Sequence, residues 1–341
     1  MNLYVHFPFC RSKCAYCALH SYVGKTDAER RAYVDEIAAK IGAFFASSGG
    51  KALSTLYFGG GTPAMCDLSG LLDIISGQKK SEDFEFTVEL NPLDVKPEFL
   101  TALKKGGVNR LSMGVQSFDD AILQTMGRPH TAEQARNAWR MIRDAGFENA
   151  GIDLICGWPD ETGGAWMRTL EYAASLKPDH CSVYTLILEP NTWLAHDVER
   201  GRITLPSDDA ALAELAAAEC ALGSVGLERY EISSFAKPGR ECRHNLATWR
   251  GEDYTGIGDG ACSREGNAVS RVIFRLRLLK EGFSPIKAAA DFPELASRVD
   301  EWTETLDRFV AEGLLSVFGE NTYRLTRRGT EVCDTILAEL V

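Results

Sequence analysis

Residues 3–17 read LYVHFPFCRSKCAYC, and the organisation of the whole chain follows outward from this stretch. Its first five residues alternate apolar and more polar side chains, which is the pattern of a half-buried β-strand. The strand runs directly into a loop that carries Cys10, Cys14 and Cys17. Three thiols within eight residues at the end of a strand predict a metal or cluster site on a β-strand scaffold.

Further strand-like runs follow, separated by amphipathic helical patterns that end in Gly or Pro. The expected strands are Leu3–Phe7, Ser54–Phe58, Glu85–Leu90, Arg110–Val115, Asn149–Ile155 and His180–Ile187, and the expected helices include Asp27–Phe45, Pro97–Lys105, Thr131–Ala145 and Gly164–Ser175. Regular alternation of this kind predicts an α/β fold with a parallel sheet, curled into an incomplete (β/α)6 barrel. In such barrels the chemistry lies at the carboxyl ends of the strands.

The pattern changes after residue 205, so we expect a barrel over residues 1–205 and a smaller α+β domain over residues 206–341. An Ala-rich helix is expected at Ser207–Gly223 and a strand at Tyr230–Phe235. From about residue 285 the order helix, turn, hairpin, helix is similar to a winged-helix module.

Bulk composition excludes several classes of function. The 341 residues carry 37 Lys+Arg and 48 Asp+Glu, a formal charge of -11, which disfavours nonspecific nucleic-acid binding. A local contact through Arg324, Arg327 and Arg328 is the alternative. No apolar run reaches the length of a membrane span, and no secretory signal precedes the first strand. Ten cysteines without an export signal predict a reducing, cytoplasmic location.

The spacing Cys10-x3-Cys14-x2-Cys17 favours a [4Fe–4S] cluster, because three ligands leave one iron open. The amino and carboxylate groups of S-adenosylmethionine can chelate such an open iron. A zinc site is the alternative, since His20 follows Cys17 at the same two-residue spacing and would complete a Cys3His tetrahedron.

Polar and Gly-rich groups follow the other strands, where they would share one rim with the cysteine loop. The run Gly59–Pro63 would let a ligand approach the backbone, or it is an ordinary strand-to-helix turn. Glu89 would accept from a ligand ammonium, or it is a cap or a salt-bridged acid. Gln116 and Asp153 suit ribose hydroxyls or the ammonium, and Arg128 suits a carboxylate. We expect His6, Tyr4 and Tyr184 to pack inward, although Tyr4 and Tyr184 could also touch a bound methionine.

Seven motifs in order resemble the oxygen-independent coproporphyrinogen III oxidase family: LYVHFPFCRSKCAYC, YFGGGTP, VELNP, RLSMGVQSF, MGRPH, DLICGWPDET and SVYTLILEPNT. The resemblance spans roughly residues 2–262 and implies a radical SAM barrel with a [4Fe–4S] cluster on the three cysteines. It also implies S-adenosylmethionine contacts from Tyr4, Gly60, Gly61, Thr62, Glu89, Gln116, Arg128 and Asp153.

Two departures favour the HemW-like heme chaperone branch over the true oxidases. The oxidases carry a fourth cysteine where this chain has Leu19, and a long extension before the first strand. The chaperone branch implies heme binding through a motif that reads His244-Asn245-Leu246-Ala247-Thr248-Trp249 here, with His244 as an axial ligand and Cys242 as a softer candidate. Thr248 replaces the family tyrosine, and the segment after Ala261 is some tens of residues shorter than is usual. The alternative for His244 is a turn or cap residue hydrogen-bonded within the C-terminal domain.

The resemblance therefore implies a chaperone that binds heme and delivers it to a hemoprotein client. Heme or another tetrapyrrole is the expected small partner, and flavodoxin or ferredoxin the expected electron donor. The alternatives are a radical SAM oxidoreductase acting on a porphyrinogen, a zinc-binding module, and a nucleic-acid-binding C-terminus.

Overall fold

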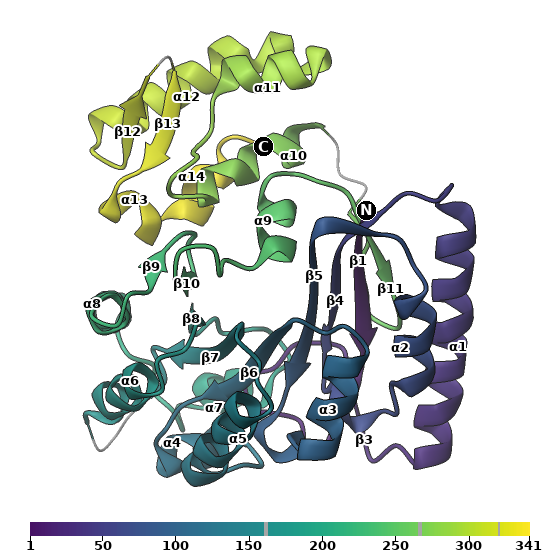
Figure 1. Cartoon of the computed structure of the whole chain (residues 1–341). Helices are drawn as coiled ribbons and strands as arrows, with labels where there is room; N and C mark the ends of the chain where they lie inside the picture. The colour runs from purple at the N-terminus through teal and green to yellow at the C-terminus, as the bar shows by residue number, and fades with distance from the viewer. Residues whose placement is uncertain (160–162, 265–267, 320) are drawn as a thin grey trace.

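The computed structural model describes residues 1–159, 163–264, 268–319 and 321–341, and its centre is a nine-stranded sheet in the order β11-β1-β4-β5-β6-β7-β8-β10-β9 (Figure 1). Six consecutive neighbours are parallel. They are β1 (Asn2–Phe7), β4 (Leu53–Gly60), β5 (Lys80–Leu90), β6 (Arg110–Gln116), β7 (Ala150–Cys156) and β8 (His180–Thr185). These are the six strands predicted from the sequence, so the α/β partial barrel is confirmed.

Helices connect these strands along the outside of the sheet, as crossover connections require. The longest, α1, begins after Thr26, whose side chain accepts from the Glu29 backbone N–H in a capping box. The helices are α1 (Asp27–Ser47), α2 (Ser69–Ser76), α3 (Pro97–Lys105), α4 (Asp120–Thr125), α5 (Ala132–Asp144), α6 (Ala165–Ser175), α7 (Trp193–Glu199) and α8 (Asp208–Gly223). Short elements η1 (Pro63–Met65), η2 (Pro92–Asp94), β2 (Phe9–Cys10) and β3 (Tyr22–Val23) lie in the connections.

Both edges of the sheet are formed by strands from beyond residue 205. The strand β11 (Tyr254–Ile257) adds in parallel to β1. At the other edge, β10 (Ser234–Ala236) adds antiparallel to β8, and β9 (Glu228–Arg229) adds antiparallel to β10. The strand expected at Tyr230–Phe235 was therefore misplaced, because residues 230–233 form a turn between two short strands. The two predicted domains share one sheet, and the boundary after residue 205 stays a prediction.

The C-terminal elements surround an apolar cluster of their own, drawn in green to yellow above the barrel (Figure 1). They are α9 (Arg243–Trp249), α10 (Ala268–Ile273), η3 (Phe274–Arg277), α11 (Pro285–Asp291), η4 (Pro293–Arg298), α12 (Val299–Ala311), β12 (Leu315–Phe318), β13 (Thr322–Leu325), α13 (Arg327–Glu331) and α14 (Cys333–Ala338). The order from α12 through the β12–β13 hairpin to α13 and α14 matches the winged-helix-like end that was expected. Among the described residues, no helix is long and apolar enough to cross a membrane.

Candidate functional site

The cysteine loop follows β1 and β2 and lies against two other segments of the rim. The backbone N–H of Ala15 donates to Met126 O at 2.9 Å, and Ala15 O accepts from Leu194 N at 2.9 Å. The Tyr16 ring meets the Trp158 ring edge-on, with centroids 5.8 Å apart. The loop is therefore held between α4, α7 and the β7–α6 connection.

Cys10, Cys14 and Cys17 are free thiols of intermediate exposure. Burial raises the pKa of Cys10 and of Cys17, and the neighbouring thiols raise both further. In the described part of the chain, no three His, Cys, Asp or Glu side chains are arranged as ligands of a metal ion. The donor set still fits the expected cluster, because the three thiols share one partly exposed loop with no disulfide among them.

The fourth ligand of the zinc alternative packs elsewhere. The His20 ring meets the Tyr22 ring edge-on with centroids 4.9 Å apart, and its Cβ lies beside Gly260. A Cβ built on Gly260 would stand 2.6 Å from that of His20, so the site requires glycine there. The described geometry therefore does not group His20 with the thiols.

Arg128 joins the cysteine loop to the end of β6. Its Nη1 donates to Cys14 Sγ at 3.5 Å and its Nη2 donates to Gly114 O at 2.6 Å. Its Nε is buried and has no hydrogen-bond partner among the described residues. An orphaned, positively charged donor beside a thiol is suited to an anionic ligand group, as the predicted carboxylate contact requires.

Gln116 ends β6 at a register shift, with a φ of 69°. A positive φ is strained for any residue except glycine, and strain of this kind gathers at functional sites. The Gln116 amide also lies near Gly114, where a Cβ would stand 3.0 Å from Nε2. Gln116 and Arg128 thus crowd the same turn of the rim.

The Gly59–Pro63 run is explained by packing within the chain. A Cβ on Gly60 would collide with the His6 imidazole, and one on Gly61 would stand 2.7 Å from Phe9 O. Gly61 N also donates to Phe7 O at 2.8 Å, and Thr62 is buried. Because these glycines have no side chain, the end of β4 can pack directly against the backbone at the start of the cysteine loop. This packing positions the loop in the absence of a ligand.

Glu89 and Asp153 face the interior of the barrel. Glu89 accepts from Tyr57 Oη at 2.7 Å and from Gly60 N at 3.1 Å, while burial raises its pKa to about 7. Asp153 accepts from Ser112 Oγ at 3.1 Å and 3.2 Å, and burial raises its pKa as well. The negative charge of one carboxylate disfavours ionisation of the other. A cationic ligand group near both would relieve this repulsion and would therefore be bound favourably.

Tyr4 and His6 form a short chain from the barrel interior to the cysteine loop. Tyr4 Oη and His6 Nδ1 share a hydrogen bond of 2.9 Å, and His6 Nε2 donates to His20 O at 2.9 Å. His6 is therefore a satisfied core histidine, as predicted. Tyr184 is 44% exposed, yet it lies on the same face of β8 as Ser182, and burial and the charge of Asp153 raise its pKa.

His244 lies in the barrel wall, where its ring is hydrogen-bonded to a strand of the barrel and not within the C-terminal domain, as one alternative had it. Its ring shares a 2.8 Å hydrogen bond with Thr55 Oγ1 of β4, and Thr55 in turn donates to Asn2 Oδ1 at 3.0 Å. The ring centroid is 5.2 Å from that of Tyr57 and 5.8 Å from that of Tyr254. Only 6% of the residue is exposed, and burial lowers its pKa to about 4.

A buried acid on β5 holds the start of α9. Glu85 accepts from the backbone N–H of Arg243 at 3.0 Å and of His244 at 3.1 Å, so it caps the helix. Cys242 donates its thiol to the same carboxylate at 3.6 Å, and burial raises the pKa of this thiol to about 12. Arg110, almost fully buried, lies 4.0 Å from Glu85. This network was not predicted from the sequence. Its only indication there is that Glu85 and Arg110 are charged residues within otherwise apolar strands.

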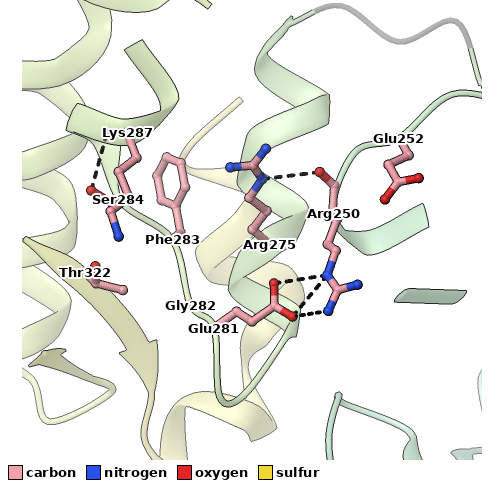
Figure 2. Close-up of a pocket in the computed structure, with 9 residues that line it drawn as sticks. All are labelled: Arg250, Glu252, Arg275, Glu281, Gly282, Phe283, Ser284, Lys287 and Thr322. Carbon is pink, nitrogen blue, oxygen red and sulfur yellow. Dashed lines mark hydrogen bonds and ion pairs between the residues drawn. The ribbon is translucent and has the colours of Figure 1, made fainter. Parts of the chain in front are cut away.

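A polar cleft of about 430 Å³ opens beyond the other end of α9 (Figure 2). Arg250 pairs with Glu281 through contacts of 2.6–3.2 Å, and Arg275 donates to Arg250 O. Lys287 lines the cleft with no ion pair to another described residue. No His or Cys lines it, so it offers no iron ligand.

The barrel and its cysteine loop define a radical SAM protein, and the model of the Radical SAM superfamily matches residues 4–173. Heme chaperone HemW of Bacillus subtilis (strain 168) is 38% identical over 267 residues, covering 76% of this chain and 70% of that protein. Heme chaperone HemW of Mycobacterium tuberculosis (strain ATCC 25618 / H37Rv) is 30% identical over 376 residues, covering 100% and 94%. The chain belongs to the HemW family of radical SAM proteins.

A solved structure supports the fold across nearly the whole chain. Coproporphyrinogen III oxidase (HemN) from Escherichia coli, a radical SAM enzyme, superposes with a TM-score of 0.81 and covers 99% of this chain and 89% of its own. At 22% sequence identity this likeness is one of fold. The alignment with the mycobacterial relative is longer than the 341 residues of this chain, so that relative carries residues that this chain lacks.

Proposed function

We propose that this protein is a heme chaperone that carries a [4Fe–4S] cluster on Cys10, Cys14 and Cys17 and binds S-adenosylmethionine at the same rim. Membership of the HemW family supports the chaperone function. The observation that carries the site is the contact of Arg128 with Cys14, since Arg128 brings beside the cluster loop a guanidinium donor that has no partner among the described residues. When bound, the cluster would supply one electron at low potential to the sulfonium ligand.

The residues of the rim have separable tasks in this proposal. Arg128 would hold the carboxylate of the ligand, and Glu89 and Asp153 would attract its ammonium and ribose hydroxyls. Gln116 would form a hydrogen bond with the ligand at the same turn as Arg128. Gly60, Gly61 and Thr62 would keep the end of β4 close to the cysteine loop. Tyr4 would hold His6, and through it the backbone of the cysteine loop, in register.

Heme is cargo in this proposal, and a hemoprotein client receives it. Flavodoxin or ferredoxin would reduce the cluster, and a reducing cytoplasm would keep the three thiols available. Ligation of heme by His244 stays a prediction, and it would require the ring to leave Thr55 and the surrounding tyrosines. Cys242 fits no better, because its thiol is protonated and buried.

Hemin titration of the anaerobically reconstituted protein tests the function directly. Hemin should bind with a change in its Soret band, and the loaded protein should transfer heme to an apo-hemoprotein such as apomyoglobin. A protein with a full cluster that binds no hemin would contradict the proposal. Cleavage of S-adenosylmethionine that depends on added coproporphyrinogen would instead favour the radical SAM oxidoreductase.

A further inference from the structure

The six histidines of the chain divide sharply by accessibility. Four are buried with a ring nitrogen already hydrogen-bonded: His6 to Tyr4 and His20, His130 to Val115 O, His180 to Tyr230, and His244 to Thr55. Only His20 and His196 are exposed. A histidine can ligate the iron of a flat macrocycle only where the macrocycle can reach its imidazole, so these two are the histidine candidates.

His196 stands on the exposed face of α7. Trp193, His196 and Arg200 follow each other at spacings of three and four residues, which places them on one side of the helix and its C-cap. Trp193 is 69% exposed and the His196 side chain 54% exposed. The nearest ion-pair partner of His196 is Glu199, at 3.7 Å, which is beyond hydrogen-bond distance.

The connection that leads into α7 adds further exposed apolar surface. Ile187 is 66% exposed, and Leu188 is also exposed. Large apolar side chains gathered on one exposed segment mark binding sites more often than chance. Arg200 is exposed and forms no ion pair with another described residue. The segment therefore combines an apolar surface, an imidazole and an available guanidinium.

The opposite face of the same helix is fixed to the cysteine loop. Leu194 is buried in an apolar cluster with Met126 and Trp158, and its backbone N–H donates to Ala15 O, between Cys14 and Tyr16. The helix that carries the exposed face is thus joined directly to the cysteine loop. Cluster occupancy and ligand binding can influence each other through this contact.

We propose that the exposed face formed by Ile187, Leu188, Trp193, His196 and Arg200 binds heme, with His196 as the axial ligand. This inference rests on the proposed chaperone function and assigns a site to it. The indole and the aliphatic side chains suit the apolar macrocycle, and the Arg200 guanidinium suits a propionate. His20 differs, because its ring packs on Tyr22 and its Cβ on Gly260.

The experiment compares two probes, hemin and iron-free protoporphyrin IX, on the reconstituted full-length protein. His196→Ala should weaken hemin binding by about tenfold or more and shift the Soret band, with little effect on the iron-free macrocycle. Trp193→Ala should weaken both probes. His20→Ala and Lys287→Ala are the matched controls and should bind both probes as the wild type does.

The possible outcomes distinguish failure of the proposed heme site from failure of the proposed chaperone function. Hemin binding by the wild type that is unchanged in His196→Ala and Trp193→Ala overturns this site but leaves the chaperone function standing. Variants that keep hemin affinity but lose transfer to an acceptor would assign the surface to a protein partner, and would also overturn the heme site. A wild type that binds no hemin removes the proposed function together with the site.

Discussion

The rim that bears the cysteine loop and the wall where α9 packs differ in their thiols, in their backbone strain and in the partners of their side chains. At the rim, three thiols are free, Arg128 has a buried donor without a described partner, and Gln116 holds a strained φ. In the α9 wall, Glu85 accepts from two backbone N–H groups and His244 is bonded to Thr55. The wall also holds buried donors without a described partner, at Arg110 Nε and Trp249 Nε1. The free thiols and the strained backbone therefore distinguish the rim as the region that awaits a ligand, whereas the bonds of Glu85 and His244 maintain the fold.

The largest expected effect is loss of the cluster. Cys14→Ala removes one of three ligands, and a cubane held by two cysteines should not survive purification. Iron and sulfide content should fall to near zero, as measured by colorimetric assay after anaerobic reconstitution. Cys220→Ala, which removes an exposed thiol elsewhere, should retain the wild-type iron content. Equal iron in both variants would place the cluster off this loop.

The next effect concerns stability, in the α9 wall. Glu85→Gln leaves the buried Arg110 charge without its partner and weakens the cap of α9, at a cost of about 3–5 kcal/mol in the free energy of unfolding. Urea unfolding of the apoprotein measures the change. Glu82→Gln, on the exposed part of the same strand, serves as the control and should change little. A similar small change in both variants would remove Glu85 from its proposed role.

His244 and His196 are the two candidate heme ligands, and their substitution should change the free energy of unfolding by different amounts. His244→Ala removes a packed ring and takes from Thr55 one of its two hydrogen-bond partners, which should cost about 2–4 kcal/mol, whereas His196→Ala should cost less than about 0.5 kcal/mol. A double-mutant cycle of His244→Ala with Thr55→Val should show coupling of about 1 kcal/mol. Additive effects in the cycle would show that the bond between them contributes no stability.

The last expected effect is a pH dependence from Glu89, which is absent at low pH and develops only as the pH rises. Burial is the main cause that raises its pKa from 4.5 to about 7, and Asp153 adds to it, while Tyr57 and Gly60 oppose it through hydrogen bonds. A raised folded pKa means that the folded state binds more protons between those two values. The contribution of Glu89 to stability is therefore greatest below pH 4.5 and is lost as the pH rises through 7.

Unfolding of the wild type and of Glu89→Gln at several pH values isolates this contribution. The wild type should lose about 3 kcal/mol relative to the variant between pH 4.5 and pH 8. A constant difference across that range would show that Glu89 ionises normally in the folded protein.

The barrel was predictable because its strands are local apolar runs. All six expected strands are present, from β1 to β8, since each run is long enough to be recognised without knowledge of its neighbours. The four residues of β11 escaped prediction because the strand is short, contains Gly256 and pairs with β1 from some 250 residues away. Short strands depend on their partner, which the local sequence does not reveal.

The site was predictable to the extent that its chemistry is carried by residue type and spacing. The cysteine loop and Arg128 do lie together at the rim. The glycines of the 59–61 run leave room for His6 and Phe9, and their contact with a ligand stays a prediction. The role of Glu85 depends on a contact with residues 158 and 159 positions away, and no local pattern indicates it. The accessibility of His196, compared with His244, likewise follows only from tertiary structure.

Parallel measurement of iron content and urea unfolding in Cys14→Ala and His244→Ala tests this division most directly. Cys14→Ala should lose its iron while its apoprotein unfolds at nearly the wild-type denaturant concentration. His244→Ala should unfold at a markedly lower concentration while its folded fraction retains iron. Loss of iron in His244→Ala without a loss of stability would contradict the assignment of function to the rim and of fold maintenance to the α9 wall.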